Sequence, residues 1–364
     1  MIDVFYTLDG LNIIHNNQII TLKNFNSGFI DIFNNKINYW KENDDKDNTP
    51  NTFFHYENEQ IKEKVFNILQ RFSISHELIQ GSNKPRYYTP EFDYSTLNDN
   101  YLGIGHSTKD GQLFSIVFEL NQYGEPIFIW SDLEHLEELE LNAGSVYNQD
   151  MDFDKFLAEG NGVSLNAVSK IPKNNLSDKR FEEGNYLVSE RSKGIIFIID
   201  KDTKKVIWKT KPLMFNHHSS HYAHMIPNGL LGEGNILFYD NGGLKNTSKI
   251  IEFNPITFEI VFEYESEILK SYFRGSVQKT IKGTYLVCVP EQGRLVEIDK
   301  NKNIIRDLKL DKEHKFESGN MKNITFGRMN TNLLSFYRIE QIPYEWAEEL
   351  IKSPFIEKEI KKLD

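Results

Sequence analysis

Cysteine is almost absent from this chain, because Cys288 is the single thiol among 364 residues. A disulfide needs two thiols, so no bridge within the chain can form. Cys288 lies in the apolar run TYLVCVP, where a cysteine packs as a small hydrophobic residue. We therefore predict a buried core cysteine rather than a catalytic thiol.

Positive charge is also in short supply. Lysine and arginine total 42 against 53 aspartates and glutamates, which gives a formal net charge of −11. Nucleic-acid-binding proteins concentrate Lys and Arg on the surface that neutralises the phosphates. The charge balance therefore argues against a nucleic-acid partner.

Long hydrophobic runs and a targeting segment are missing too. No apolar run approaches the roughly 20 residues that cross a bilayer. The first residues, MIDVFYTLDGLNIIHNN, contain no basic stretch followed by an apolar core and a small-residue cleavage site. We expect no membrane insertion and no secretory signal, and hence a cytoplasmic or virion-associated protein.

Internal repetition is the strongest feature that the sequence does contain. A turn and an apolar strand, a second β-branched strand, a polar turn and a third strand recur in the same order. The repeats are Asn100–Trp130, Gly184–Lys209, Gly234–Glu265 and Gly283–Leu310. A period of about 50 residues built from short strands is typical of propeller blades. A β-sandwich made of similar hairpins is the alternative.

The sequence thus predicts an all-β fold, a single β-propeller of five or six blades with a few peripheral helices. The propeller is assigned to residues 91–346, and a further blade is expected from Ile324–Ile342 together with the first 35 residues. Residues 1–90 are predicted to form an N-terminal segment with strands and an amphipathic helix, partly packed on the propeller or used for docking. Residues 347–364 are predicted to form a C-terminal helix.

Two regions break the repeat. Within Asn58–Ile79, apolar residues at helical spacing predict the amphipathic helix; they are Ile61, Val65, Ile68 and Leu69. The acidic stretch Ser131–Glu159 is expected to be partly helical and to lie over one end of the propeller. Its charges are interpreted as a solvated face rather than a binding site.

The densest group of ionisable residues is the run NHHSSHYAH, which contains His217, His218, His221 and His224. On a helix, the first, third and fourth of these histidines would suit zinc, but the run leads directly into a strand, so we predict no metal. A second interpretation is a set of exposed loop histidines without a role. A third is nucleophilic catalysis by an imidazole, which needs nearby donors to stabilise an anionic group.

The run SHYAHMIPNGLLGEGNILFYDNGG resembles the arylsulfotransferase family. In that family a histidine precedes a Leu-Pro-Asn-Gly turn, a Gly-Asn-apolar strand and an Asp-Asn-Gly end. The corresponding residues here are His221, Ile226-Pro227-Asn228-Gly229, Gly234-Asn235-Ile236 and Asp240-Asn241-Gly242. Upstream, SLNAVSKIP and GNYLVSER place Asn166 and Arg191 on the family's asparagine and arginine, and the resemblance extends from about Asp93 to Trp346.

The resemblance implies transfer of a sulfuryl group from a small aryl sulfate to a phenolic acceptor through a sulfohistidine. His221 would attack sulfur as a neutral imidazole, and Arg191 would hold the sulfuryl oxygens as a planar charged fork. Asn166 would donate a further hydrogen bond to these oxygens. The resemblance implies neither a metal nor a diffusible cofactor.

The sequence also departs from the family pattern. Ser164 replaces a family histidine, Phe92 beside Asp93 stands where another is loosely aligned, and Tyr222 replaces an often acidic residue. A family threonine in the loop before Val277 and Gln278 is replaced by a residue within Arg274, Gly275 and Ser276. We therefore assign substrate binding to the candidates His217, His218, His224, Ser164, Arg274 and Ser276.

These departures keep other functions open. Arg191 could end a strand in a surface ion pair, Asn166 could form a turn, and His221 could be a scaffold residue. The chain would then be a catalytically degenerate propeller that binds a surface glycan or receptor, for example at a cell surface or on a phage virion tail. A purely structural interaction propeller is the third possibility. The N-terminal segment could support a homo-oligomer or a larger assembly.

Overall fold

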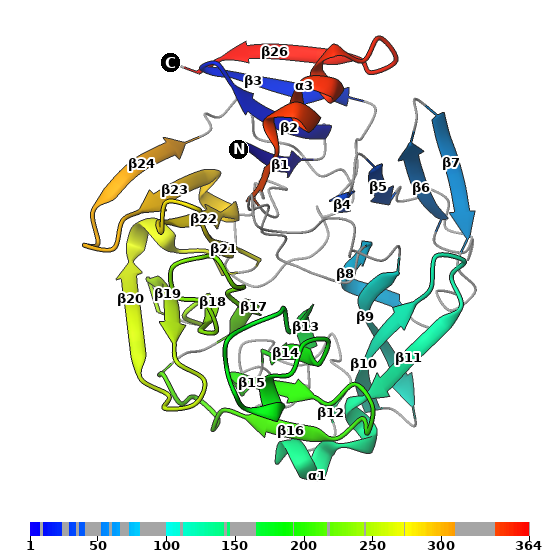
Figure 1. Ribbon diagram of the computed structural model, residues 1–364, viewed down its shortest axis with the longest axis vertical. Coiled ribbons are helices and arrows are strands. Elements are labelled where there is room, and N and C mark those ends of the chain that lie inside the picture. The colour runs from blue at the N-terminus through cyan, green and yellow to red at the C-terminus, as the bar shows by residue number, and fades with distance from the viewer. Residues whose placement is uncertain are drawn as a thin grey trace.

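The computed structural model describes residues 1–7, 10–23, 29–33, 36–40, 52–57, 60–65, 73–80, 100–109, 112–141, 144–145, 165–191, 193–216, 219–243, 245–272, 274–309 and 339–363. These residues form six antiparallel sheets, which follow one another around a ring (Figure 1). The predicted all-β propeller is therefore confirmed.

Five of the sheets use consecutive segments of the chain, and we name them B to F in chain order. Sheet B contains β4 (Phe29–Phe33), β5 (Lys36–Trp40), β6 (Thr52–Glu57) and β7 (Gln60–Val65). Sheet C contains β8 (Ser73–Gln80), β9 (Tyr101–Lys109), β10 (Gln112–Leu120) and β11 (Pro126–Ser131), and β12 (Gly144–Ser145) pairs with β10. Sheet D contains β13 (Leu165–Lys170), β14 (Tyr186–Glu190), β15 (Ile195–Ile199) and β16 (Val206–Lys209). Sheet E contains β17 (Ser220–Met225), β18 (Ile236–Asp240), β19 (Ser248–Phe253) and β20 (Ile260–Ser266), and sheet F contains β21 (Ser276–Lys279), β22 (Tyr285–Val289), β23 (Arg294–Ile298) and β24 (Ile304–Lys309).

Sheet A joins the two ends of the chain. Its strand order is β25 (Ile339–Ile342), β1 (Ile2–Thr7), β2 (Gly10–His15), β3 (Gln18–Leu22) and β26 (Lys358–Lys362). The expected partnership of the first strands with the segment that ends at Ile342 is confirmed, because β1 pairs with β25. The N-terminal residues are therefore part of the ring and not an appended segment, since β1–β3 and β4–β7 each belong to a sheet.

The amphipathic helix predicted within Asn58–Ile79 is wrong. That region contains β7 and β8, and β7 pairs with β6. Helical and strand periods are hard to separate in a short window, and here cross-strand pairing decides the outcome. The predicted C-terminal helix is correct only in part. Helix α3 (Tyr344–Lys352) forms, but Lys358–Lys362 form β26, which pairs with the exposed side of β3.

Short helical elements lie between the strands, as expected for peripheral structure. The acidic stretch after β11 begins with the 3-10 turn η4 (Asp132–Glu134) and the helix α1 (Leu136–Leu139). The other 3-10 turns are η5 (Lys179–Phe181), η6 (Glu267–Leu269) and η7 (Pro290–Gln292). None of the described helices is long and apolar enough to cross a membrane.

A buried ionic group joins sheet C to sheet D. The Glu119 carboxylate accepts hydrogen bonds from Lys170 Nζ at 2.9 Å and from Tyr186 Oη at 2.6 Å. Burial opposes ionisation of Glu119, but its pKa is lowered overall because Lys170 and these hydrogen bonds favour the carboxylate. The contact thus connects β10 to the first strands of the next sheet.

The same arrangement recurs between sheets E and F. Glu252 accepts from Lys279 Nζ at 2.8 Å and from Tyr285 Oη at 2.7 Å. The junction between sheets D and E has apolar residues at the corresponding register positions. They are Ile198, Met225 and Ile236, and all belong to one buried cluster.

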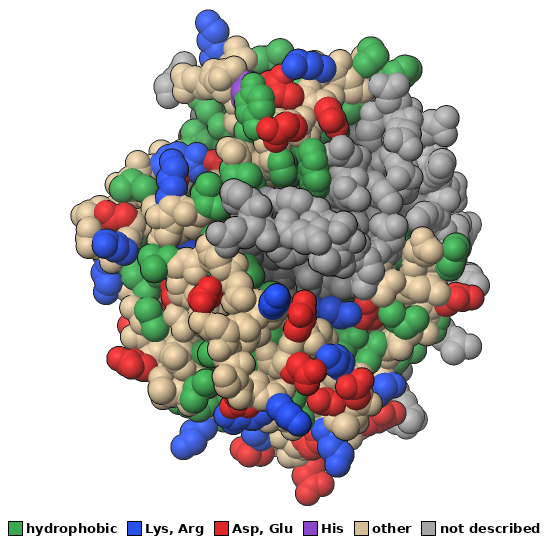
Figure 2. Space-filling model, in the orientation of Figure 1, with side chains coloured by type: hydrophobic (Ala, Val, Ile, Leu, Met, Phe, Trp, Pro, Cys, Tyr) green, Lys and Arg blue, Asp and Glu red, His purple; other side chains and the backbone are tan. Residues whose placement is uncertain are grey.

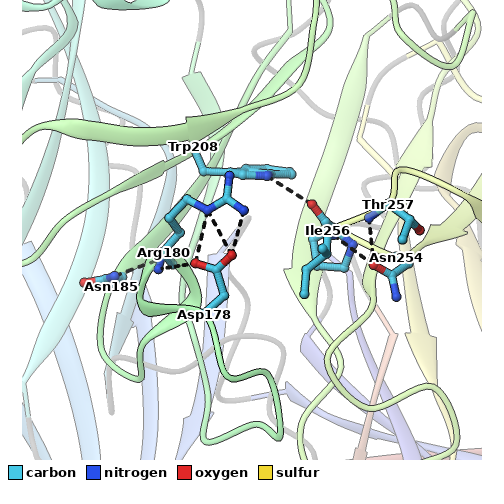
Figure 3. A network of polar contacts seen from close by, with 8 residues as sticks. Asp178, Arg180, Asn185, Trp208, Asn254, Ile256 and Thr257 are labelled. Atoms are coloured by element: carbon cyan, nitrogen blue, oxygen red, sulfur yellow. Dashed lines mark hydrogen bonds and ion pairs between the residues drawn. The ribbon is translucent and has the colours of Figure 1, made fainter.

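Aromatic side chains fasten the outer parts of neighbouring sheets. Trp208 of β16 donates from Nε1 to the carbonyl oxygen of Pro255 at 3.1 Å, in the turn between β19 and β20. Figure 3 shows the Trp208 ring directed at this turn, where Asn254 Oδ1 accepts from the backbone N–H groups of Ile256 and Thr257. The turn is therefore rigid enough to offer a fixed acceptor.

Charges of both signs are interspersed on the face of the molecule drawn in Figure 2. Among the coloured residues, acidic and basic side chains alternate over the lower sheets.

Candidate functional site

The candidate site is built on β17, which lies toward the centre of the ring together with β13 and β21 (Figure 1). The pairing of β17 with β18 shifts after His221, because Tyr222 and Ala223 lie opposite a single residue, Phe238. Tyr222 has a φ of 57°, in the left-handed region that a bulky side chain rarely adopts. Such bulges redirect side chains and are frequent beside active sites. The irregularity therefore falls directly after the predicted nucleophile.

His221 is a buried histidine in a cationic environment. Its pKa is lowered to about 3, first by burial, then by the neighbouring Arg191, with a smaller contribution from Arg274. Hydrogen bonds with the Asn241 side chain and the Ser219 backbone favour the protonated ring but only partly offset these effects on the pKa. The imidazole is consequently neutral at physiological pH, which is the form that can act as a nucleophile.

Arg191 and Arg274 reach His221 from the two neighbouring sheets. Arg191 follows β14 in sheet D, and burial lowers its pKa while the adjacent Glu190 raises it. Both arginines are half-buried. An arginine remains charged even in such surroundings, and a guanidinium matches the oxygens of a sulfuryl or similar group.

The position of Arg274 depends on the glycine that follows it. Gly275 has a φ of 101°, and a Cβ there would lie 2.6 Å from the Tyr239 ring. Tyr239 is the register partner of His221. A glycine is therefore required for the chain to pass this close to the strand beside His221, and Arg274 is held next to the site.

Asn166 also lies beside the strand that carries His221, but both ends of its amide bind other groups of the protein. Its Nδ2 donates to the carbonyl oxygen of Ser220 at 2.7 Å, and its Oδ1 accepts from Ser189 Oγ at 2.9 Å. Ser220 directly precedes His221. Asn166 thus connects β13 to β17 and fixes the backbone before the histidine, a different contact from the sulfuryl bond that the resemblance implies.

Asn241 is a site residue that the sequence analysis did not single out as functional. Its side chain is near enough to the imidazole to raise the pKa of His221, and its Nδ2 donates to the carbonyl oxygens of Ser271 and Arg274, both at 2.8 Å. Its backbone N–H donates to Ser219 at 3.2 Å. The Asp-Asn-Gly motif was the available signal. Its asparagine couples the His221 strand to the Arg274 loop.

Ser276 begins β21 and stands opposite Cys288 in the register. Its hydroxyl is buried, and no hydrogen-bond partner is found for it among the described residues. The predicted burial of Cys288 is confirmed, and burial raises the pKa of its thiol, although Arg274 lowers it. A buried hydroxyl without a protein partner is a group that can bind a ligand.

The other predicted residues have different fates. His224 is buried, its Nδ1 lies 2.9 Å from the Tyr222 carbonyl oxygen, and burial lowers its pKa to about 3. This contact places His224 in the strand interior, where it supports the bulge. His217, His218 and Ser164, like Phe92, lie outside the described residues.

A histidine that the sequence analysis passed over lies in a second interruption. In β8, Ser75 and His76 fall between residues paired with Gly105 and Ile104 of β9. The irregular pairing in β8 lies at the same position in its sheet as the irregular pairing at Asn166 in β13. The sequence analysis expected a helix in this region, because the bulge interrupts the alternation of apolar and polar residues that would have indicated a strand.

No cluster of His, Cys, Asp and Glu within the described ranges could hold a metal ion. The site instead combines a neutral histidine, two arginines, a buried hydroxyl and positioning amides. The fold is thus a β-propeller in which a buried neutral histidine lies near two arginines. A model of the arylsulfotransferase (ASST) family matches residues 96–310, which is more than half of the chain. The chain belongs to this family.

Solved structures that are similar to this chain share little of its sequence. A protein of unknown function from Bacteroides caccae is 11% identical with a TM-score of 0.46, over 85% of this chain and 94% of that one. The Dos1 propeller is 10% identical with a TM-score of 0.45, over 78% and 73% of the two chains. Apo AztD from Citrobacter koseri is 7% identical with a TM-score of 0.39, over 85% and 95%. No curated protein matches the sequence.

Proposed function

We propose that this protein transfers a sulfuryl group from an aryl sulfate to a phenolic acceptor through a covalent intermediate on His221. The observation that carries the proposal is the buried, neutral imidazole beside two guanidinium groups from the neighbouring sheets. A neutral nitrogen can donate its lone pair, and fixed positive charge next to it favours an anionic electrophile. Membership of the arylsulfotransferase family supports the reaction class.

Binding of the sulfate ester is assigned to Arg191 and Ser276. Arg191 would hold two sulfuryl oxygens as a bidentate fork, and the Ser276 hydroxyl would donate to the third. Ser276 is buried and Arg191 is half-buried, and reduced contact with water strengthens the interaction of each group with an anion. The substrate-binding role predicted for Ser276 thus has a physical basis in its unpaired hydroxyl among the described residues.

In the first step, a ring nitrogen of His221 forms a bond to sulfur while the bond between sulfur and the aryl oxygen breaks. The electron pair of the broken bond leaves with the phenolate. We assign Arg274 to this oxygen, because its charge can stabilise the phenolate without transferring a proton. This assignment offers a substitute for the acid histidines that are replaced in the sequence.

In the second step, the oxygen of the acceptor phenol attacks sulfur, and the bond between nitrogen and sulfur breaks. The electron pair returns to the imidazole, and the acceptor's proton passes to solvent or to the departing nitrogen. Where the nitrogen takes the proton, the imidazolium then releases it to solvent, so His221 ends the cycle as a neutral imidazole by either route. No step needs a redox change or a resident metal.

The test is a chromogenic aryl sulfate incubated with a phenol. Release of coloured phenolate and formation of the new sulfate ester are expected, and His221→Ala should abolish both. His15→Ala removes a histidine of sheet A whose Nε2 lies 3.3 Å from Glu348, and should leave turnover unchanged. Turnover by His221→Ala equal to the unmodified protein would contradict the proposal.

A binding module is the competing function, because positions of family histidines hold Ser164 and Phe92. It would retain affinity for sulfated ligands without turning them over. Binding of a sulfated glycan, together with no trapped sulfohistidine by mass spectrometry, would favour the binding module over the transferase.

A further inference from the structure

Lys270 is a buried lysine at the start of the loop that leads to Arg274. It directly follows η6, and only 9% of its surface is exposed. Its Nζ donates to the carbonyl oxygens of Asn241 and Gly243, both at 2.9 Å. The ammonium group therefore fixes both ends of the turn that begins with Asn241.

This turn carries the contacts that organise the site. The Asn241 backbone N–H donates to the Ser219 carbonyl oxygen, two residues before His221, and its side chain donates to the carbonyl oxygen of Arg274. The side chain also lies near enough to the imidazole to affect the pKa of His221. A displacement of Asn241 would consequently move both the nucleophile and the cationic loop. Lys270 lies in the connection between β20 of sheet E and β21 of sheet F.

Three groups face the ammonium of Lys270. The Tyr272 ring lies 4.0 Å from Nζ, and the carboxylates of Asp240 and Glu291 are close enough to interact with its charge. Burial lowers the pKa of Lys270 to about 8, although Glu291 and Asp240 favour the charged form. Lys270 thus loses its proton within an accessible pH range, unlike an exposed lysine.

We propose that Lys270 is a positioning residue that holds His221 and Arg274 in their reactive arrangement through Asn241. The proposal rests on the proposed function, because the reactive arrangement is that of the sulfuryl-transfer site. The charged ammonium makes stronger bonds to the two carbonyl oxygens than the neutral amine does. The arrangement is therefore secured at low pH and loosens as Lys270 loses its proton.

The contact with Gly243 distinguishes Lys270 from its neighbours. Ser248 Oγ also donates to the Asn241 carbonyl oxygen, at 2.9 Å, so that oxygen keeps one donor when Lys270 is removed. Gly243 has a φ of 55°, which marks a tight turn. Loss of Lys270 is expected to loosen the turn without unfolding sheet E.

The first experiment measures the burst of phenolate released by a chromogenic aryl sulfate without acceptor, from pH 6 to pH 9.5. Lys270→Met should reduce the burst rate at pH 7 by roughly tenfold or more, the loss that a charge-assisted hydrogen bond predicts. Lys270→Arg should restore most of the rate and should remove the decline above pH 8 shown by the unmodified protein. Lys201→Met is the control, because Lys201 Nζ also donates to a backbone carbonyl, that of Glu183, in a turn of sheet D.

The second experiment does not depend on turnover. The ring-nitrogen shifts of His221 are recorded by NMR, and the affinity for inorganic sulfate is measured by calorimetry. Lys270→Met should move the His221 signals and weaken sulfate binding several-fold, whereas Lys201→Met should change neither.

The two proposals can fail separately. No burst from the unmodified protein, with a Lys270-dependent His221 signal and sulfate affinity, would overturn the transferase and support the positioning role. An unchanged His221 signal and sulfate affinity in a folded Lys270→Met variant would overturn the positioning role. An unchanged pH profile in Lys270→Arg would also overturn it.

Discussion

Asn166 Nδ2 donates to the carbonyl oxygen of Ser220 at 2.7 Å, so an amide of sheet D fixes the residue before His221 in sheet E. Asn166 lies where β13 departs from regular pairing with β14, and Ser220 lies just before the irregular part of β17, which follows His221. A bulge makes the backbone less constrained by its own ladder, and a bond from the neighbouring strand compensates for this freedom. The geometry of the nucleophile is thus set by contacts between sheets.

Asn166→Ala is expected to lower the rate of sulfuryl transfer by about 10² while changing KM little. The reason is that a small misplacement of a reacting group is costly in rate, whereas substrate binding by the arginines persists. Single-turnover and steady-state kinetics measure the two effects. Ser169→Ala is the matched control, because Ser169 Oγ also links β13 to β17, at the Ala223 carbonyl oxygen and 3.4 Å away. A large rise in KM with an unchanged rate would instead support direct contact with the sulfuryl group.

The rate of phenolate release should show no loss from protonation of His221 between pH 8 and pH 4. Burial and the arginines lower the pKa of His221 to about 3, so the nucleophilic neutral form predominates throughout this range. Arg191→Met removes a neighbouring charge and should raise this pKa, although burial keeps it below the ordinary value. NMR titration of His221 and the pH profile of the burst provide the measurements. A decline in the burst rate centred near pH 6.5 would contradict the assigned environment of His221.

The repeats and their turns could be predicted from the sequence because they are local. Apolar strands end in short polar turns, as where Asn254 binds its own turn at Ile256 and Thr257. The region of β7 and β8 was predicted wrongly, because its apolar residues also fit a helical period and only pairing with β6 and β9 defines the strands. The same holds for β26, whose pairing with β3 joins distant segments.

The site was predictable only in its chemistry. The resemblance selected His221, Arg191 and Asn166, and the structure brings these residues together. It did not reveal that Asn166 binds a backbone carbonyl, or that Asn241 links the histidine to the Arg274 loop. These contacts depend on bulges and on neighbouring sheets, which leave no regular sequence pattern.

Asp132 should make the folded protein less stable as the pH rises toward 8. Burial raises the pKa of Asp132 to about 7, and Glu190 also raises it, against hydrogen bonds from Ser115. The stability associated with the protonated form is complete below the ordinary pKa of 3.8 and is lost as the pH rises through 7. Asp132→Asn should therefore be increasingly stabilising relative to the unmodified protein, by about 1.4 kcal/mol per pH unit at most over this range.

Urea unfolding at a series of pH values measures this difference. Asp200 provides a control of opposite sign, because hydrogen bonds from Thr203 lower the pKa of Asp200. The benefit of ionised Asp200 is present above pH 3.8 and is lost as the pH falls. Equal pH slopes for the Asp132→Asn variant and the unmodified protein would contradict the assignment.

The buried ionic groups around Glu119 and Glu252 should be replaceable by apolar residues, because the junction between sheets D and E is already apolar at the same positions. Lys279→Met leaves Glu252 charged and buried without its cation, and is expected to destabilise the fold by about 3–5 kcal/mol. The triple variant Glu252→Ile, Lys279→Met, Tyr285→Phe copies the apolar character of Ile198, Met225 and Ile236. It should recover most of that loss, since an apolar set of similar volume avoids burying charges.

Denaturant unfolding of Lys279→Met and of the triple variant measures their free energies of unfolding relative to the unmodified protein. Recovery in the triple variant would mean that the ionic group is not needed for stability at the junction between sheets E and F. The loss in Lys279→Met would then come from the buried Glu252 carboxylate left without its cation. A triple variant as unstable as Lys279→Met would mean that the junctions are not interchangeable. The hydrogen bond from Asn235 to Glu252, at 2.7 Å, would then be the contact that the apolar set fails to replace.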